Sequence, residues 1–190
     1  ALRGRLAVLN IESPFLRDTD FGPIIDNDAK QRLNQHISWL DEHAKLIAQV
    51  PMPDSLPSDL YLAPCAYELS DFKELTEEFF GPILHIIPFN HDDLDSKLQQ
   101  MNDSGYGLTL GVHSRNQRWI DYITHNAIVG NIYINRNMIG AKVGSQPFGG
   151  HGLSGTGPKA GGPNYVHAFV KEYTITTNTS AFGGNQELLG

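Results

Sequence analysis

Apolar and polar positions alternate at helical spacing early in the chain. Between residues 29 and 40 an apolar side chain recurs every three or four positions, which predicts one long amphipathic helix capped by Asp26 or Asn27. Residues 1–9 carry leucines on one helical face but no capping residue before them, which predicts the end of a helix that begins in an earlier segment. A short apolar run at residues 45–50 predicts a strand.

From residue 61 onward the pattern changes to short apolar runs separated by amphipathic segments. The strand-like runs occupy residues 61–69, 83–89, 108–113 and 130–135, and the helical patterns occupy residues 92–101 and 117–127. This alternation predicts an α/β fold with a mostly parallel sheet covered by helices. We expect residues 1–170 to form this domain and residues 171–190 to follow it as a polar C-terminal strand and tail.

Eight glycines gather in residues 144–162, soon after the last predicted strand of the domain. A flexible linker rich in glycine and serine is one interpretation of such a stretch. Phe148, Leu153 and prolines within it favour the other interpretation, an ordered loop whose backbone N–H groups face an anion. Ligands of parallel α/β sheets bind beyond the carboxyl ends of the strands, and this glycine-rich loop follows such an end.

The composition narrows the class of protein. With 190 residues, of which 40% are apolar and 18% charged, the chain is long enough for one well-buried domain. A net charge of −7 argues against nucleic acid as a partner, and no apolar run is long enough to span a bilayer. Its single cysteine excludes an intrachain disulfide and a multi-cysteine metal site. We therefore expect a cytoplasmic protein in which this segment contacts neither nucleic acid nor membrane and binds no metal ion.

Two nucleotide-binding motifs and one candidate nucleophile can be set aside. Residues 150–155 match GxGxxG, but prolines flank them where the dinucleotide fingerprint needs a strand and a helix. The P-loop spacing fails as well, because Pro158 stands where the lysine is required. Cys65 lies inside an apolar run, so we interpret it as a buried side chain and not as a thiolate. The eight histidines show no paired spacing typical of metal ligands.

Five motifs in order resemble those of the aldehyde dehydrogenase superfamily. They are Glu77-Glu-Phe-Phe-Gly-Pro82, Tyr106-Gly-Leu108, Gly130-Asn131 through Asn135, Pro147-Phe-Gly-Gly150 and Ser154-Gly155. Residues 144–165 look like its Δ1-pyrroline-5-carboxylate (glutamate-γ-semialdehyde) dehydrogenase branch. Residues 176–189 resemble an extension found in bifunctional proline-utilisation proteins (PutA), in which an FAD-dependent proline dehydrogenase precedes this enzyme.

The resemblance assigns roles to six residues. It implies that Glu78 binds a ribose of NAD and that Phe80 packs beside the nicotinamide. It also implies that the backbone amides of Gly161 and Gly162 bind the carboxylate of the substrate. The two remaining residues are aromatic, with Phe169 placed against the aliphatic part of the substrate and Phe148 lining the aldehyde channel.

The resemblance also implies that the chemistry lies outside this chain. In the family a cysteine thiolate attacks the aldehyde, hydride passes to NAD, and the thioester is hydrolysed. The matching cysteine, the general-base glutamate and the NAD-binding domain are expected upstream, so we expect no catalytic residue here and an inactive isolated chain. Alternatives are a fragment of another semialdehyde dehydrogenase, or a non-catalytic folding and assembly module that forms a homo-oligomer through its C-terminal strand. A parent enzyme of this kind is expected in the cytoplasm or peripherally at the bacterial inner membrane.

Overall fold

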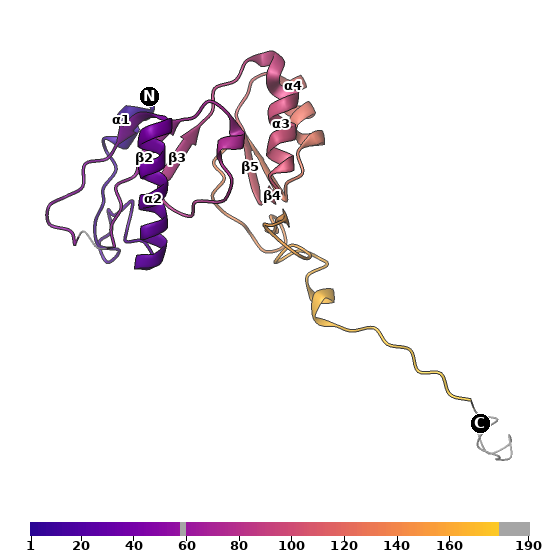
Figure 1. Ribbon diagram of the computed structural model, residues 1–190. Helices are drawn as coiled ribbons and strands as arrows, with labels where there is room; N and C mark the ends of the chain where they lie inside the picture. Colours follow the sequence, from indigo (N-terminus) through magenta and orange to yellow (C-terminus); the bar gives the residue numbers. More distant parts are fainter. Residues whose placement is uncertain (58–59, 179–190) are drawn as a thin grey trace. The chain divides into compact units, whose positions relative to one another are not determined.

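The computed structural model describes residues 1–57 and 60–178, which form two compact units (Figure 1). Unit 1 contains Ala1–Gly105 and Tyr122–Ala127, and unit 2 contains Tyr106–Asp121 and the residues from Ile128 onward. Residues 179–190, which carry part of the PutA resemblance, lie outside the described residues.

Unit 1 is built on a three-stranded sheet in the order β1-β2-β3. The pair β1–β2 is antiparallel and the pair β2–β3 is parallel, with Cys65 opposite Ile83 and Glu68 opposite Ile86. Its elements are α1 (Leu2–Leu6), α2 (Asn27–His43), β1 (Lys45–Gln49), β2 (Cys65–Glu68), η1 (Phe72–Glu74), β3 (Ile83–Ile86), η2 (His91–Asp93) and α3 (Leu94–Asp103).

The long helix α2 covers the sheet of unit 1, as the periodicity predicts. Asp26 caps the helix, because its Oδ1 accepts a hydrogen bond from the Ala29 N–H at 2.7 Å. Leu40 of α2 is fully buried against Cys65, Tyr67 and Leu69. This core makes α2 and β2 a rigid base for the segment that connects β2 to β3.

Unit 2 contains the predicted second parallel pair. Its elements are β4 (Tyr106–Gly107), β5 (Thr109–Val112), the first half of α4 (Gln117–Asn126), β6 (Asn131–Ile134), β7 (His151–Gly152) and η3 (Val166–Phe169). Strands β5 and β6 run parallel, with Thr109 opposite Asn131 and Val112 opposite Ile134. β4 pairs with β7 in an antiparallel ladder, so the glycine-rich loop returns to the strands that precede it. The predicted α/β character is confirmed.

One local prediction differs from the structure. Residues 171–178 have exposed side chains and no strand. A polar alternating sequence forms a strand only when a partner strand accepts its hydrogen bonds, and this single chain offers none to the described part of the tail. Strand formation by residues 171–190 in an assembly stays a prediction. Among the described residues, none of the helices has the length and apolar character that a membrane span requires.

Candidate functional site

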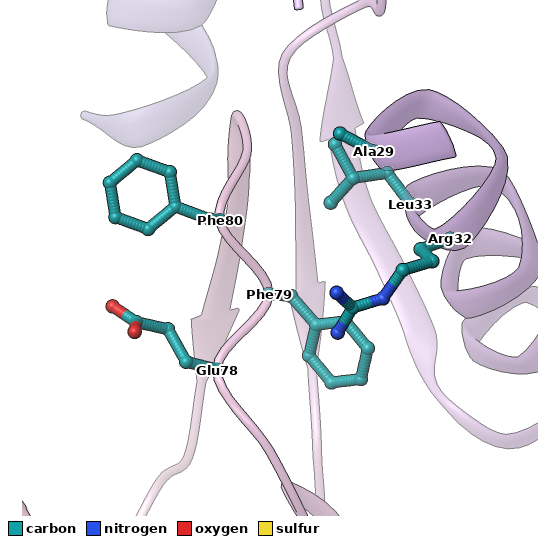
Figure 2. A pocket seen from close by; sticks show the side chains of 6 residues that line it. All are labelled: Ala29, Arg32, Leu33, Glu78, Phe79 and Phe80. Carbon is teal, nitrogen blue, oxygen red and sulfur yellow. The ribbon is translucent and has the colours of Figure 1, made fainter. Parts of the chain in front are cut away.

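The segment 77–82 crosses from η1 to β3 and lies beside α2 (Figure 2). Glu78 and Phe80 point to one side of this segment, whereas Phe79 points to the other side, toward Arg32 and Leu33 of α2. A shallow hollow of about 60 Å³ is lined by Glu78, Phe79, Phe80 and the facing residues Ala29, Arg32 and Leu33 of α2. The two residues to which the resemblance assigns cofactor contacts therefore share one exposed side.

Two successive tight turns give the segment its shape. The Gly81 N–H donates to the Phe79 carbonyl at 2.9 Å, and the Ile83 N–H donates to the Gly81 carbonyl at 2.9 Å. Phe80 lies at the centre of the first turn and is 87% exposed. A Cβ at Gly81 would lie 2.5 Å from the Leu33 Cδ1, so a larger residue at this position would require the Leu33 side chain to shift.

The two neighbouring carboxylates have different surroundings. Glu77 pairs with Arg32 at 2.6 Å. Glu78 is exposed, and within residues 1–57 and 60–178 it has neither an ion pair nor a hydrogen bond. An exposed, unpaired carboxylate accepts hydrogen bonds from hydroxyl groups, and an exposed phenyl ring packs against a planar ring. This pair of side chains fits the nicotinamide riboside part of NAD.

An aromatic stack on α2 supports the segment from behind. The centroids of the Phe79 and His36 rings are 3.4 Å apart, and the angle between the ring planes is 6°. Trp39 stacks on His36, and His43 stacks on Trp39, along the same helix. The Nε2 atoms of His36 and His85 are 2.8 Å apart, so one ring donates a hydrogen bond to the other. His85 lies on β3, 49 residues away in sequence, and no local pattern reveals this pairing.

The buried position of His36 predicts an unusual titration. Burial, and then the charge of His85, lower the pKa of His36 to about 4, against a smaller opposing effect of Glu77. Because the unfolded chain binds this proton near pH 6.5, we expect the free energy of unfolding to fall as the pH drops from about 6.5 toward 4. Proton NMR of the imidazole resonances checks this: His36 should remain neutral at pH 5.5, and an inflection near pH 6.5 would contradict the prediction.

In unit 2 hydrogen bonds hold the glycine-rich loop, residues 144–162, in place, which favours an ordered loop over a flexible linker; its contact with an anion stays a prediction. The backbone groups of Phe148 and Ala160 exchange two hydrogen bonds, at 3.1 and 2.8 Å. The Asn131 side chain donates to the Pro147 carbonyl at 3.0 Å and accepts from the Gly149 N–H at 3.3 Å. The Lys159 ammonium donates to the Gly130 carbonyl and to the Asn131 amide oxygen. The Asn131 side chain thus holds the loop at residues 147–149, and the Lys159 side chain holds it at residue 159. The sequence motifs alone do not indicate these contacts.

The predicted carboxylate anchor has one free donor in this structure. Gly161 has a φ of 72° at the third position of a turn in which the Gly162 N–H donates to the Lys159 carbonyl at 3.0 Å. Within the described ranges, the Gly161 N–H has no acceptor. If both amides bind one ligand, the Gly162 N–H must donate to the ligand and to the Lys159 carbonyl at the same time. The two-amide anchor therefore stays a prediction.

The two aromatic residues of the expected substrate site also lie in unit 2. Phe148 is half-buried and sits in the loop beside Ala160, one residue before Gly161. Phe169 lies in η3 and is 74% exposed. Its ring meets the Tyr165 ring edge-on, with the two ring centroids 5.3 Å apart. The glycine-rich loop therefore groups Phe148 with Gly161 and Gly162, whereas Phe169 follows on the next short helix. Glu78 and Phe80 belong to unit 1.

Cys65 is confirmed as a buried side chain. It is 1% exposed, and burial, followed by the nearby charge of Asp41, raises the pKa of its thiol to about 11. A protonated thiol without solvent access does not act as a nucleophile.

The fold and these motifs define the class of protein. The model of the aldehyde dehydrogenase family matches residues 1–175, so the chain belongs to the aldehyde dehydrogenase family. The expected superfamily is confirmed.

Three proteins show which branch of the family the chain is similar to. It is 47% identical over 174 residues to the bifunctional protein PutA of Escherichia coli, covering 89% of this chain and 13% of that protein. A crystal structure of a Bradyrhizobium japonicum PutA variant superposes with a TM-score of 0.84 at 49% identity, covering 95% of this chain and 18% of that one. A 1-pyrroline-5-carboxylate dehydrogenase from Thermus with bound NAD gives a TM-score of 0.77 at 31% identity, covering 88% and 32%. The chain therefore spans less than a third of the length of each of these proteins.

Proposed function

We propose that this chain is the C-terminal part of the catalytic domain of an NAD-dependent dehydrogenase that oxidises L-glutamate γ-semialdehyde to glutamate in proline catabolism. One observation carries the proposal: the chain is similar along 88–95% of its length to PutA and 1-pyrroline-5-carboxylate dehydrogenase proteins. The exposed pair Glu78 and Phe80 and the ordered glycine-rich loop support it, because they supply the two kinds of contact that the reaction needs.

Each set of residues has a binding task in this proposal. Glu78 accepts hydrogen bonds from ribose hydroxyls, and Phe80 packs against the nicotinamide ring. The Gly161 N–H, joined by that of Gly162, donates to the substrate carboxylate, while Phe148 and Phe169 contact its apolar chain. A site built to hydrogen-bond a carboxylate disfavours aldehydes that leave these donors unpaired. NAD, when bound, accepts the hydride, and the nucleophilic cysteine and the general base come from an upstream part of the enzyme.

The proposal also covers the partners of this chain and the location of the enzyme in the cell. We infer an upstream NAD-binding domain as the intramolecular partner of this chain and a homo-oligomer formed through residues 171–190. If the parent protein is bifunctional, its proline dehydrogenase part uses FAD. We place the enzyme in the cytoplasm.

Replacing Glu78 with glutamine in the intact dehydrogenase tests the cofactor role. Hydrogen bonds to charged groups contribute about 1.5–3 kcal/mol, so we expect the KM and Kd for NAD⁺ to rise about tenfold or more. The KM for the semialdehyde should stay within about twofold, since Glu78 binds only the cofactor in this proposal. Steady-state kinetics and calorimetry measure both quantities.

The neighbouring substitution Glu77→Gln is a matched control. It removes an equal charge one position away, but from a carboxylate that is paired with Arg32 of α2, whereas Glu78 points away from this helix. Its effect on NAD⁺ affinity should be small. Equal losses for the two variants would show that net charge, and not the Glu78 contact, governs cofactor affinity.

A further inference from the structure

The side chains of the segment that carries Glu78 and Phe80 point alternately to opposite sides. Figure 2 shows Phe79 directed toward α2, while Glu78 and Phe80 are directed away from it. Glu77 also faces α2, because it pairs with Arg32. Any contact that fixes Glu77 and Phe79 therefore restricts the direction of Glu78 and Phe80 as well, since the four residues are consecutive in the chain.

The contact of Phe79 holds the segment more firmly than the contact of Glu77. In the Arg32–Glu77 pair the side chains are 66% and 50% exposed, and ion pairs at such exposed positions contribute little to stability. Phe79 instead stacks with parallel rings on His36, which is only 6% exposed. His36 lies between Leu33 and Leu40, two buried residues of the same helix, so its backbone is fixed.

His85 determines the orientation of the His36 ring. The two Nε2 atoms are 2.8 Å apart, and His85 comes from β3, the strand that directly follows the segment. Rotation of His36 away from Phe79 would break this hydrogen bond and leave a buried ring nitrogen without a partner, which is energetically unfavourable. The chain is thereby fastened to α2 on both sides of the tight turns, through Phe79 on one side and through His85 of β3 on the other.

We propose that His36 and His85 are positioning residues for cofactor binding. Their hydrogen bond fixes the ring on which Phe79 stacks, and this stack directs Glu78 and Phe80 toward the cofactor. Neither histidine contacts the cofactor. The inference rests on the proposed function, in which Glu78 and Phe80 bind NAD.

Equilibrium binding of NAD⁺ to the intact dehydrogenase, measured by calorimetry, tests this inference with the substitution His85→Leu. We expect the Kd for NAD⁺ to rise about tenfold, because the arrangement that binds the cofactor becomes a minority of the population. Binding of the product L-glutamate should be unchanged. His85→Gln keeps a side-chain amide that can hydrogen-bond to His36, and should restore the Kd to within about threefold of the parent value.

A control and a second variant complete the test. His43→Leu removes the ring at the far end of the same stack, where it contacts Trp39, and should leave the Kd unchanged. If His85→Leu does not yield folded enzyme, Phe79→Leu removes the stacked ring and should weaken NAD⁺ binding alone. The inference is overturned if His85→Leu, or Phe79→Leu in its place, binds NAD⁺ within twofold of the parent while Glu78→Gln does not. Parent-like binding by Glu78→Gln would instead overturn the cofactor role in the proposed function.

Discussion

Replacing Gly130 with alanine should destabilise unit 2 by more than about 3 kcal/mol, at the upper end of what overpacking costs. A Cβ at this position would overlap the Gly149 carbonyl oxygen and lie 2.7 Å from its carbon and 2.8 Å from the Gly150 Cα. These are backbone atoms, so no side-chain rotation relieves the overlap. The glycine-rich loop would have to move away from β6. Thermal unfolding and limited proteolysis of the loop measure the effect.

Gly157→Ala provides a matched control for this substitution. Gly157 belongs to the same loop, but a Cβ there meets no atom within 4 Å, and its φ lies outside the range that favours glycine. This variant should be neutral or slightly more stable, because alanine restricts the unfolded chain. Similar melting temperatures for the Gly130 and Gly157 variants would contradict the close approach of the loop to β6.

The second large effect is expected at Gly161. Its φ of 72° costs an L-residue about 1–2 kcal/mol, and a Cβ would lie 3.0 Å from the Val143 Cα. In the intact dehydrogenase, Gly161→Val should raise the KM for the semialdehyde at least about tenfold, while the KM for NAD⁺ stays within about twofold. Steady-state kinetics with each substrate varied in turn distinguish the two constants.

Gly162→Val should act in the same direction but less strongly. The φ of Gly162 is not in the left-handed region, and its N–H already donates to the Lys159 carbonyl. A Cβ there would meet that carbonyl oxygen at 3.0 Å. If either variant raised both KM values equally, the glycine pair would be a structural element only and not the carboxylate anchor.

The sequence predicted those elements whose formation depends on nearby residues. Asp26, one of the two predicted caps, precedes the helix α2, and the two parallel strand pairs follow the predicted apolar runs. The strand predicted from residue 171 onward is absent from the described tail, because pairing of a strand depends on a partner that local sequence does not supply.

The candidate site could be located from its motifs, but the contacts that hold it could not. His36 and His85 are far apart in the chain, and nothing near either residue indicates that they meet. Asn131 belongs to a recognised motif, yet only the structure shows its side chain bound to both Pro147 and Gly149. The resemblance implied that two backbone amides form the anchor, whereas the turn commits one of them, the Gly162 N–H, to the Lys159 carbonyl.

The burial of the single cysteine has a practical consequence for experiments on a larger enzyme that carries this chain. Alkylating reagents such as iodoacetamide react with thiolates, and Cys65 offers neither a thiolate nor access while the protein is folded. Any label taken up under native conditions would therefore report on cysteines elsewhere in that enzyme. Uptake at Cys65 would instead signal that the core between α2 and β2 has opened.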